Sequence, residues 1–395
     1  MAWRRRRREA GAGPECASPA EIDGESMGVS RKVNMALVGL GKMGISHMAI
    51  ANASQRIELR AVCDSFAMLG QMIEKHCKVD YVPTYDDIIA RPGLEAVIIA
   101  TPTRFHGDMV RTALERGLHV FCEKPMTLSA ALSEELAEEA LKRKLVGQVG
   151  YHNRFVGTFA EAGRLLKAGA IGRIRHVHAE AYGPVVLKPA AKTWRSSSHE
   201  GGGCLYDYAA HPINLMNWYV GRPVECIGAE LAQQYSAEVD DAVYANLRFA
   251  NGVTGQVTVN WSDETMRKMT TRITVYGDGG KLIVDRQELY LYVGTTGKAT
   301  EGYGEGWTVR NITELTPPID YYLRGEEYSL QIEGFAQAII DGDLACTNDF
   351  HSAAVTDATL EMIRARAAAE PPPLAAMGAP TVAPRRGLVS RVLGR

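Results

Sequence analysis

The sequence lacks three features that would each assign a chain to a whole class of proteins. No apolar run approaches the roughly 20 residues that a membrane-spanning helix needs. The net charge of −2 leaves no excess of positive charge with which to bind nucleic acid or an anionic membrane surface. The seven cysteines form no Cys-x-x-Cys pair and no Cys/His cluster at zinc spacing. We therefore expect no metal, no nucleic-acid partner and no membrane span, and the scattered cysteines fit a reducing cytoplasm best.

Both ends of the chain lack the periodicity of a packed domain. Residues 1–32 are rich in Gly, Ala, Glu and Arg, and residues 371–395 begin with prolines and end in a basic stretch. Such a composition cannot bury enough apolar surface to offset the entropy of ordering the chain. The run from Arg4 to Arg8 has no apolar segment after it, so it does not predict a secretory signal. We expect two disordered tails that flank the folded part of the chain.

The folded part changes its pattern near its middle. Over residues 33–152, almost continuously apolar strands alternate with helices, which predicts βαβ units and a doubly wound parallel sheet covered on both faces. Over residues 153–370, strands are joined by hairpin turns such as "FANG" and "GDGG". Helices near 203–220, 327–341 and 352–369 should cover one face of this second sheet. The sequence thus predicts an α/β Rossmann domain followed by an α+β domain with a largely antiparallel sheet.

A glycine motif follows the first predicted strand. "GLGKMG" places Gly39, Gly41 and Gly44 in the pattern G-x-G-x-x-G between a strand and a helix, and Asp64 ends the next strand. In a dinucleotide-binding turn the first glycine permits the tight turn, the second lets the backbone approach the phosphates, and the third lets helix and strand pack closely. Asp64 would accept hydrogen bonds from the adenosine ribose and repel a 2′-phosphate. Since Ser65 supplies no cation, NAD is favoured over NADP.

Further cofactor contacts are expected beside these motifs. The loop "ATPTRFH" follows the strand "EAVIIA" and lies at the carboxyl edge of the sheet, where ligands bind in such folds. Its last residue opens the next helix and could equally be a cap or a packing residue. The candidate cofactor-binding residues are Gly39, Gly41, Lys42, Met43, Gly44, Asp64, Thr101, Pro102, Thr103, His106, Glu123 and Lys124.

The strand "HVFC" ends in Glu123, Lys124 and Pro125. It runs parallel to the first strand, so its end faces the same crevice and brings Lys124 beside the nicotinamide end of the cofactor. A lysine there can hydrogen-bond a substrate hydroxyl and stabilise an alkoxide as hydride leaves. Pro125 cannot continue the strand ladder and fixes the turn that aims Lys124. We interpret Lys124 as catalytic, although Glu-Lys pairs are also common on protein surfaces.

A second group of polar residues lies in "GGGCLYDYAAHPINLMNW". Asp207 and His211 are four residues apart and should share one helix face. A carboxylate and an imidazole on one face can form a proton-transfer pair, in which Asp207 orients His211 or binds substrate. Core or capping roles for both residues are the alternative.

With these motifs in place, residues 33–370 resemble the Gfo/Idh/MocA family of oxidoreductases. The resemblance rests on "GLGKMG" with His47, on Asp64, and on "ATPTRFH", "EKP", "YHNRF" and the Gly-rich helix. It implies that Lys124, Asp207 and His211 surround the reacting hydroxyl and that the Lys124–Pro125 peptide bond is cis. It also implies a substrate pocket, with His152 beside the candidate substrate-binding residues Lys124, Tyr151, Asn153, Arg154, Trp194, Arg195, Asp207 and His211.

Two positions depart from the family pattern. Members often carry Asp three residues after the histidine and Gly two residues after the aspartate, where this chain has Asn214 and Ala209. The departures leave the lysine, aspartate and histidine in place. They affect the expected contacts with substrate.

The resemblance implies an NAD-dependent dehydrogenase that acts on a secondary hydroxyl of a polyol, sugar or sugar derivative. One alternative is an enzyme that oxidises a sugar transiently, eliminates a substituent and reduces the sugar again. The other is a non-catalytic NAD-binding sugar sensor, against which the retained lysine, aspartate and histidine argue. The strands "GQVTVNW" and "RITVYG" should present apolar or aromatic residues on the face opposite the helices. We therefore expect a homodimer or homotetramer.

Overall fold

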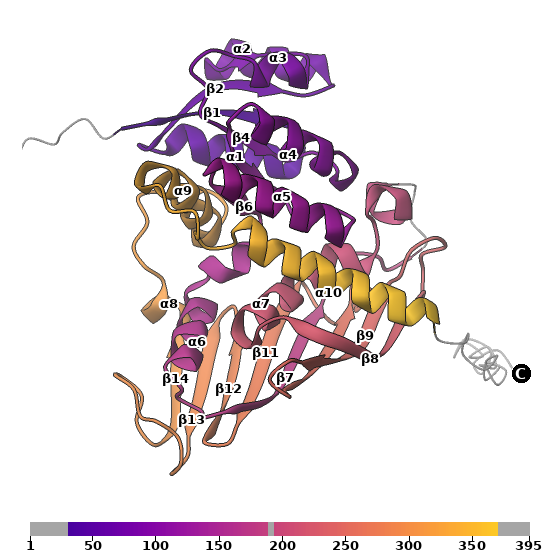
Figure 1. Ribbon diagram of the computed structural model, residues 1–395, viewed down its shortest axis with the longest axis vertical. Helices are drawn as coiled ribbons and strands as arrows, with labels where there is room; N and C mark the ends of the chain where they lie inside the picture. The colour runs from indigo at the N-terminus through magenta and orange to yellow at the C-terminus, as the bar shows by residue number, and fades with distance from the viewer. Residues whose placement is uncertain (1–30, 189–192, 370–395) are drawn as a thin grey trace, which may run out of the picture. The chain divides into compact units, whose positions relative to one another are not determined.

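The computed structural model describes residues 31–188 and 193–369, so the two predicted disordered tails fall almost entirely outside the described residues. The described chain contains a six-stranded sheet and an eight-stranded sheet, each with helices packed on it (Figure 1). No helix in these ranges combines the length and the apolar character needed to cross a membrane. The predicted α/β class and the two kinds of sheet are confirmed.

The first sheet has the strand order β3-β2-β1-β4-β5-β6, and every neighbouring pair is parallel. The order reverses between β1 and β4, which opens a crevice at the carboxyl ends of these strands. The strands are β1 (Val33–Val38), β2 (Ile57–Cys63), β3 (Asp80–Tyr81), β4 (Ala96–Ile99), β5 (His119–Cys122) and β6 (Gly147–Val149). The accompanying helices are α1 (Lys42–Ala53), α2 (Ala67–Cys77), α3 (Tyr85–Ile89), α4 (His106–Glu115) and α5 (Ala130–Arg143).

The second sheet has the order β14-β13-β12-β11-β7-β10-β9-β8, and only the β7–β10 pair is parallel. Helices α6 (Gly157–Lys167), α7 (Ala210–Val220) and α10 (Phe350–Ala369) pack on it. Its strands are β7 (Ile174–Tyr182), β8 (Pro223–Ala232), β9 (Ala242–Phe249), β10 (Thr254–Asn260), β11 (Thr270–Gly277), β12 (Gly280–Asp285), β13 (Glu288–Val293) and β14 (Gly306–Asn311). One-turn helix α8 (Ile312–Leu315) follows the last strand.

Helix α9 (Glu326–Asp341) departs from the sequence-based expectation that it covers the second sheet. It packs instead on α1 and β1 of the first domain. Its Ile332, Phe335 and Ile339 belong to the core that the first sheet buries, and the ring of Phe335 stands edge-on to Phe121 of β5 at 5.9 Å. The apolar period of the segment predicts a buried helix face, but it does not specify which sheet that face covers.

The outer face of the second sheet meets the expectation only in part, since Tyr276 of "RITVYG" is exposed there. Val257, Val259, Ile273 and Val275 are fully buried on the helix side, so the opposite side of β10 and β11 is mainly polar. The outer face exposes four aromatic residues, Tyr244, Tyr276, Tyr292 and Trp307. Strand alternation therefore places the apolar residues of "GQVTVNW" and "RITVYG" in the core, and aromatic side chains give the outer face its apolar surface.

Candidate active site

The glycine turn between β1 and α1 is shaped by steric contacts that only glycine allows. Gly39 has a φ of +94°, and a Cβ there would lie 2.6 Å from the backbone oxygen of Ala100. A Cβ on Gly44 would lie 1.7 Å from the backbone oxygen of Gly39. By contrast, a Cβ on Gly41 would meet nothing within 4 Å. Gly39 and Gly44 are therefore required by the fold, whereas Gly41 leaves open the space that a phosphate would need.

The same turn presents the start of α1. The helix begins at Lys42 after Gly41, and no side chain caps its first turn. Its leading N–H groups and the positive end of its dipole remain available for an anion. The open side of Gly41 and the uncapped N–H groups together form a cradle that fits the diphosphate of a dinucleotide.

Asp64, at the end of β2, is held between two backbone groups. Its Oδ2 accepts from the N–H of Leu40 at 2.6 Å, and its Oδ1 accepts from the N–H of Phe66 at 2.7 Å. Each carboxylate oxygen has a second lone pair, so both can still accept a hydroxyl proton. The fixed carboxylate beside the glycine turn therefore suits a ribose diol.

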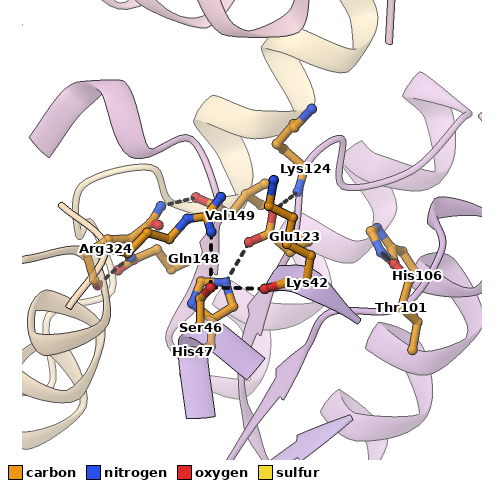
Figure 2. A network of polar contacts seen from close by, with 11 residues as sticks. Lys42, Ser46, His47, Thr101, His106, Glu123, Lys124, Gln148, Val149 and Arg324 are labelled. Carbon is orange, nitrogen blue, oxygen red and sulfur yellow. Dashed lines mark hydrogen bonds and ion pairs between the residues drawn. The ribbon is translucent and has the colours of Figure 1, made fainter. Parts of the chain in front are cut away.

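His47 joins α1 to the end of β5. Its Nε2 lies 2.6 Å from Oε1 of Glu123, and its imidazole is fully buried (Figure 2). Burial raises the pKa of Glu123, but His47 and Lys124 outweigh that effect and lower it below the ordinary value. The contact with His47 therefore fixes the position of Glu123, and with it the backbone directly before Lys124.

Lys124 reaches from the end of β5 to the second domain. Its Nζ donates to Oδ1 of Asp207 at 2.8 Å and to the backbone oxygen of Asp207 at 2.7 Å. The other oxygen of Asp207, Oδ2, accepts from Nε of Arg195 at 2.8 Å. Burial opposes ionisation of Asp207, yet the two cations outweigh it and lower its pKa to about 2. The Lys124–Pro125 bond is cis, as the family resemblance implies.

Asp207 and His211 differ from the predicted pair. Asp207 lies in a π-helical turn, Leu205–Ala209, directly before α7, and no hydrogen bond joins it to His211 among the described residues. The Nδ1 of His211 is buried and has no hydrogen-bond partner among the residues that the structure describes. Burial, then Lys124 and then His152, hold the pKa of His211 well below its ordinary value. Asp207 therefore holds Lys124, and His211 is a neutral imidazole that can accept a proton.

His106 ties two of the loops at the sheet edge together. Its Nδ1 lies 2.9 Å from the backbone oxygen of Pro125, and its Nε2 lies 2.9 Å from that of Thr101. The ring is almost completely buried. Both ring nitrogens are thus occupied by the protein, which favours the packing role over direct contact with the cofactor. Thr101, Pro102 and Thr103 follow β4 at this edge, and Thr103 is buried.

The candidate substrate residues fall into two groups. Tyr151 and His152 lie beside His211, with ring centroids 6.2 and 4.8 Å from its imidazole. The guanidinium of Arg154 instead donates to the side chain and backbone oxygens of Asn214 in α7, and is buried there. The guanidinium of Arg154 is therefore engaged in contacts within the protein. The sequence-based prediction that it binds substrate did not include these contacts. Asn214, one of the two residues that depart from the family pattern, accepts the hydrogen bonds of Arg154.

The remaining candidates lie at different depths. Asn153 is buried, whereas Trp194 is 40% exposed. The guanidinium of Arg195 lies over the ring of Trp194 at 4.7 Å, next to its ion pair with Asp207. In the part of the chain that the structure describes, no group of three or more His, Cys, Asp or Glu side chains is placed to hold a metal ion.

Two residues at this site escaped sequence reasoning. Tyr328 of α9 stacks on His152, with centroids 4.7 Å apart and ring planes 21° apart. Arg324 donates to Ser46 of α1 at 3.2 Å (Figure 2). Its guanidinium lies over the ring of Tyr328 at 4.9 Å. Neither residue belongs to a motif near the others in sequence. They reach the site because α9 packs on the first domain.

Comparison with known proteins gives two family matches. Residues 33–151 match the oxidoreductase family with a NAD-binding Rossmann fold. Residues 159–283 match the C-terminal domain of the GFO/IDH/MocA family. The matches fall on the two sheets described above, and the first contains the glycine turn and Lys124.

The chain is similar to several curated proteins over most of its length. It is 25% identical to scyllo-inositol 2-dehydrogenase (NAD(+)) of Bacillus subtilis (strain 168), over 85% of this chain and 92% of that protein. It is 26% identical to 2,7-anhydro-N-acetylneuraminate hydratase of Mediterraneibacter gnavus, over 67% of this chain and 73% of that protein.

Solved structures share the fold. Levoglucosan dehydrogenase in complex with NADH superposes with a TM-score of 0.76 at 22% identity, over 86% of this chain and 97% of that one. GenD2 from gentamicin A biosynthesis in complex with NAD superposes with a TM-score of 0.71 at 25% identity, over 91% and 98%. Together with the two family matches, the glycine cradle and the lysine at the end of β5, these likenesses show that the chain belongs to the Gfo/Idh/MocA family of oxidoreductases and carries a NAD-binding Rossmann domain.

Proposed function

We propose that the chain is a NAD-dependent dehydrogenase that oxidises a secondary hydroxyl of a polyol, a sugar or a sugar derivative. One observation carries the proposal above the others. Lys124, held by Asp207, ends a strand of the NAD-binding sheet, and a buried neutral imidazole, His211, lies in the same site. A cation that steadies an oxygen and a base that takes its proton are the two groups that oxidation of an alcohol requires of the protein.

Each residue then has a defined task. NAD, when bound, supplies the hydride acceptor. The glycine turn and Asp64 would hold its diphosphate and adenosine ribose, since both present the matching donors and acceptors. Lys124 would donate a hydrogen bond to the substrate oxygen, and His211 would take the hydroxyl proton. Asp207 would fix the ammonium of Lys124 rather than the imidazole.

The substrate class is supported by the relatives. The curated relatives named above act, by their names, on an inositol and on an anhydro sugar acid, and the solved neighbour acts on levoglucosan. All of these are rigid rings with several hydroxyls. Because the chain is only about a quarter identical to the two curated relatives, we extend this class and not any one substrate to it.

A screen for NADH formation tests the proposal. Inositols, hexoses, amino sugars and nucleotide sugars would each be incubated with the protein and NAD. The proposal requires substrate-dependent accumulation of NADH with at least one of them, and Lys124→Ala should slow it on the order of a hundredfold or more. NAD binding without turnover of any such compound would instead favour a sugar sensor.

The hydratase relative favours one second candidate. A sugar could be oxidised transiently, lose or gain a substituent, and be reduced again by the same cofactor. Such an enzyme would convert substrate with bound NAD and release no net NADH. Product analysis at catalytic amounts of NAD separates the two, because only the transient route would then convert an excess of substrate.

We also propose that the two domains have separate roles and that the chain forms a homo-oligomer. Residues 33–152 would bind NAD, and residues 153–370 would bind substrate and carry the contact between subunits. Exposed aromatic residues of the second sheet, Tyr244 and Tyr276 among them, support that contact. Light scattering should show a homodimer or homotetramer, and Tyr276→Glu should weaken it. A monomer at micromolar concentration would contradict this.

The cysteines support a cytoplasmic location for this enzyme. Cys63, Cys122, Cys204 and Cys346 are buried and form no disulfide in the described chain. Free thiols in the core suit a reducing compartment. Fractionation of cells that produce the protein would test the location.

A further inference from the structure

A buried carboxyl group lies behind the proposed catalytic residues. Asp357 of α10 is only 4% exposed. Its Oδ2 accepts from the hydroxyl of Ser133 at 2.7 Å and from the N–H of Thr127 at 3.2 Å. Thr127 is three residues beyond Lys124, so this contact fixes the loop that carries the lysine. The other oxygen, Oδ1, is buried and has no hydrogen-bond partner within residues 31–188 and 193–369.

A second buried polar group interacts with this carboxyl. The hydroxyl of Tyr151 is also buried and lacks a hydrogen-bond partner in the described chain, although it lies near enough to the Asp357 carboxyl for each to affect the pKa of the other. The two groups lie close enough to influence one another but form no closed hydrogen bond. Tyr151 stands edge-on to His211 at 6.2 Å. Asp357 therefore lies behind both the lysine loop and the imidazole.

In the part of the chain that the structure describes, Asp357 forms no ion pair with a cation. Cys122 of β5, Tyr151 and Tyr206 are the titratable neighbours from other elements, and Glu361 lies one turn further along α10. Of the cations near this group, Arg364 lies over the ring of Tyr206 at 6.0 Å, and Arg154 acts on Tyr151. Burial raises the pKa of Asp357 to about 7, although Ser133, Thr127 and Tyr151 act in the opposite direction.

We propose that Asp357 is a positioning residue whose ionisation closes the hydrogen bond to Tyr151 and so fixes the ring that supports His211. The ionised carboxylate accepts the Tyr151 hydroxyl proton in a charge-assisted hydrogen bond, which is stronger than a neutral one. The protonated carboxyl is an uncharged and weaker acceptor, so the bond stays open and the ring is held less firmly. This inference rests on the proposed dehydrogenase function, since it assigns His211 as the base.

The pH dependence of turnover tests the proposal. Turnover of the native enzyme should rise several-fold as pH passes through about 7, where the Asp357 carboxyl ionises. Asp357→Asn keeps the acceptor for Thr127 and Ser133 but cannot ionise, so it should lose this rise while NAD affinity stays unchanged. Tyr151→Phe should lose it as well. Thr359→Val, a buried change in the same helix that removes a hydrogen bond from Asn217, is the control and should keep it.

A measurement without substrate separates this proposal from the dehydrogenase function. The folded pKa of Asp357 lies above its ordinary 3.8, so the native fold loses stability as pH rises from about 4 to about 7. Asp357→Asn should therefore be at least as heat-stable as the native chain at about pH 8.

Ultraviolet resonance Raman spectroscopy reports on the hydrogen bond of the Tyr151 hydroxyl. The difference between the spectra of the native chain and Tyr151→Phe isolates the Tyr151 signal. This signal should show a stronger hydrogen bond above pH 7 in the native chain and no such change in Asp357→Asn.

The outcomes decide the case. Loss of both the pH-dependent rise and the Raman change in a stable Asp357→Asn variant supports the positioning role. A Raman signal of Tyr151 that is the same below and above pH 7 in the native chain overturns it, even if no substrate for the enzyme has been found. A pH profile of Asp357→Asn that superimposes on the native profile also overturns it, and leaves Asp357 as a structural residue.

Discussion

The two halves of the site are built in opposite ways. The cofactor cradle comes from one short stretch, Gly39 to Gly44, together with Asp64 at the end of the next strand, and it is shaped by the backbone. The substrate half is assembled from side chains on β5, the π-helical turn, α7 and α9, which are far apart in sequence. A backbone-shaped site leaves a compact sequence pattern. A side-chain site depends on how distant elements pack.

The largest expected effect is on the backbone-shaped half. Gly44→Ala would place a Cβ 1.7 Å from a backbone oxygen, so the turn must open and the fold should lose about 3 kcal/mol or more. Gly41→Ala meets nothing within 4 Å, so stability should be retained while NAD affinity falls. Thermal unfolding and calorimetric titration with NAD measure the two effects.

These two variants form a matched pair within one motif. Both replace glycine by the same side chain three residues apart. If Gly41→Ala bound NAD as tightly as the native chain, the open side of the turn would not be the place that the phosphates approach. If Gly44→Ala were fully stable, the steric account of the motif would be wrong.

The next effect concerns the residue that joins the halves. Asp207→Asn removes the charge that holds Lys124 and Arg195, so turnover should fall by about tenfold or more with little change in NAD affinity. The lowered pKa of Asp207, about 2, also makes the stability of the fold depend on pH. Asp207 stabilises the fold above its ordinary pKa of 3.8, and this contribution is lost as pH falls through about 2.

Acid titration of the two proteins checks the second effect. The native chain should lose stability between about pH 4 and about pH 2 more steeply than Asp207→Asn. Identical acid unfolding curves would mean that the two cations do not depress this pKa. Arg195→Gln is a useful companion, because it removes one cation and leaves Lys124 in place.

The smallest expected effect is on the choice of cofactor. Asp64→Ser combined with Ser65→Arg should shift preference from NAD towards NADP by about tenfold or more, because a repelling carboxylate is replaced by a cation. Asp64 also binds the N–H groups of Leu40 and Phe66, so some loss of stability is expected. Asp64→Asn is the control, since it keeps an acceptor but adds no cation. A native preference for NADP would contradict the role of Asp64.

The first domain could be predicted from sequence in detail. Its strands are buried on both faces and so are continuously apolar, and its helices follow each strand. The glycine spacing then identifies the turn, because the close contacts of Gly39 and Gly44 tolerate no other residue. The position of Lys124 at the sheet edge followed from the parallel direction of the strands alone.

The rest depended on tertiary packing. An apolar helical period cannot reveal that α9 covers the first sheet, and so Tyr328 and Arg324 could not be placed at the site. The spacing of Asp207 and His211 predicted a shared face for a regular helix, but the π-helical turn between them changes their relation. Arg154 was assigned from its motif, and only the buried position of Asn214 reveals where its guanidinium lies.

The measurement that tests the account most directly is a comparison of NAD affinity and turnover in Lys124→Ala. The lysine binds Asp207 and belongs to the substrate half, whereas the glycine turn and Asp64 should carry the affinity for NAD. The account predicts nearly native NAD binding, a native fold, and turnover reduced on the order of a hundredfold or more, with no rescue in Lys124→Arg. Full turnover in Lys124→Ala, or loss of NAD binding together with the fold, would contradict it.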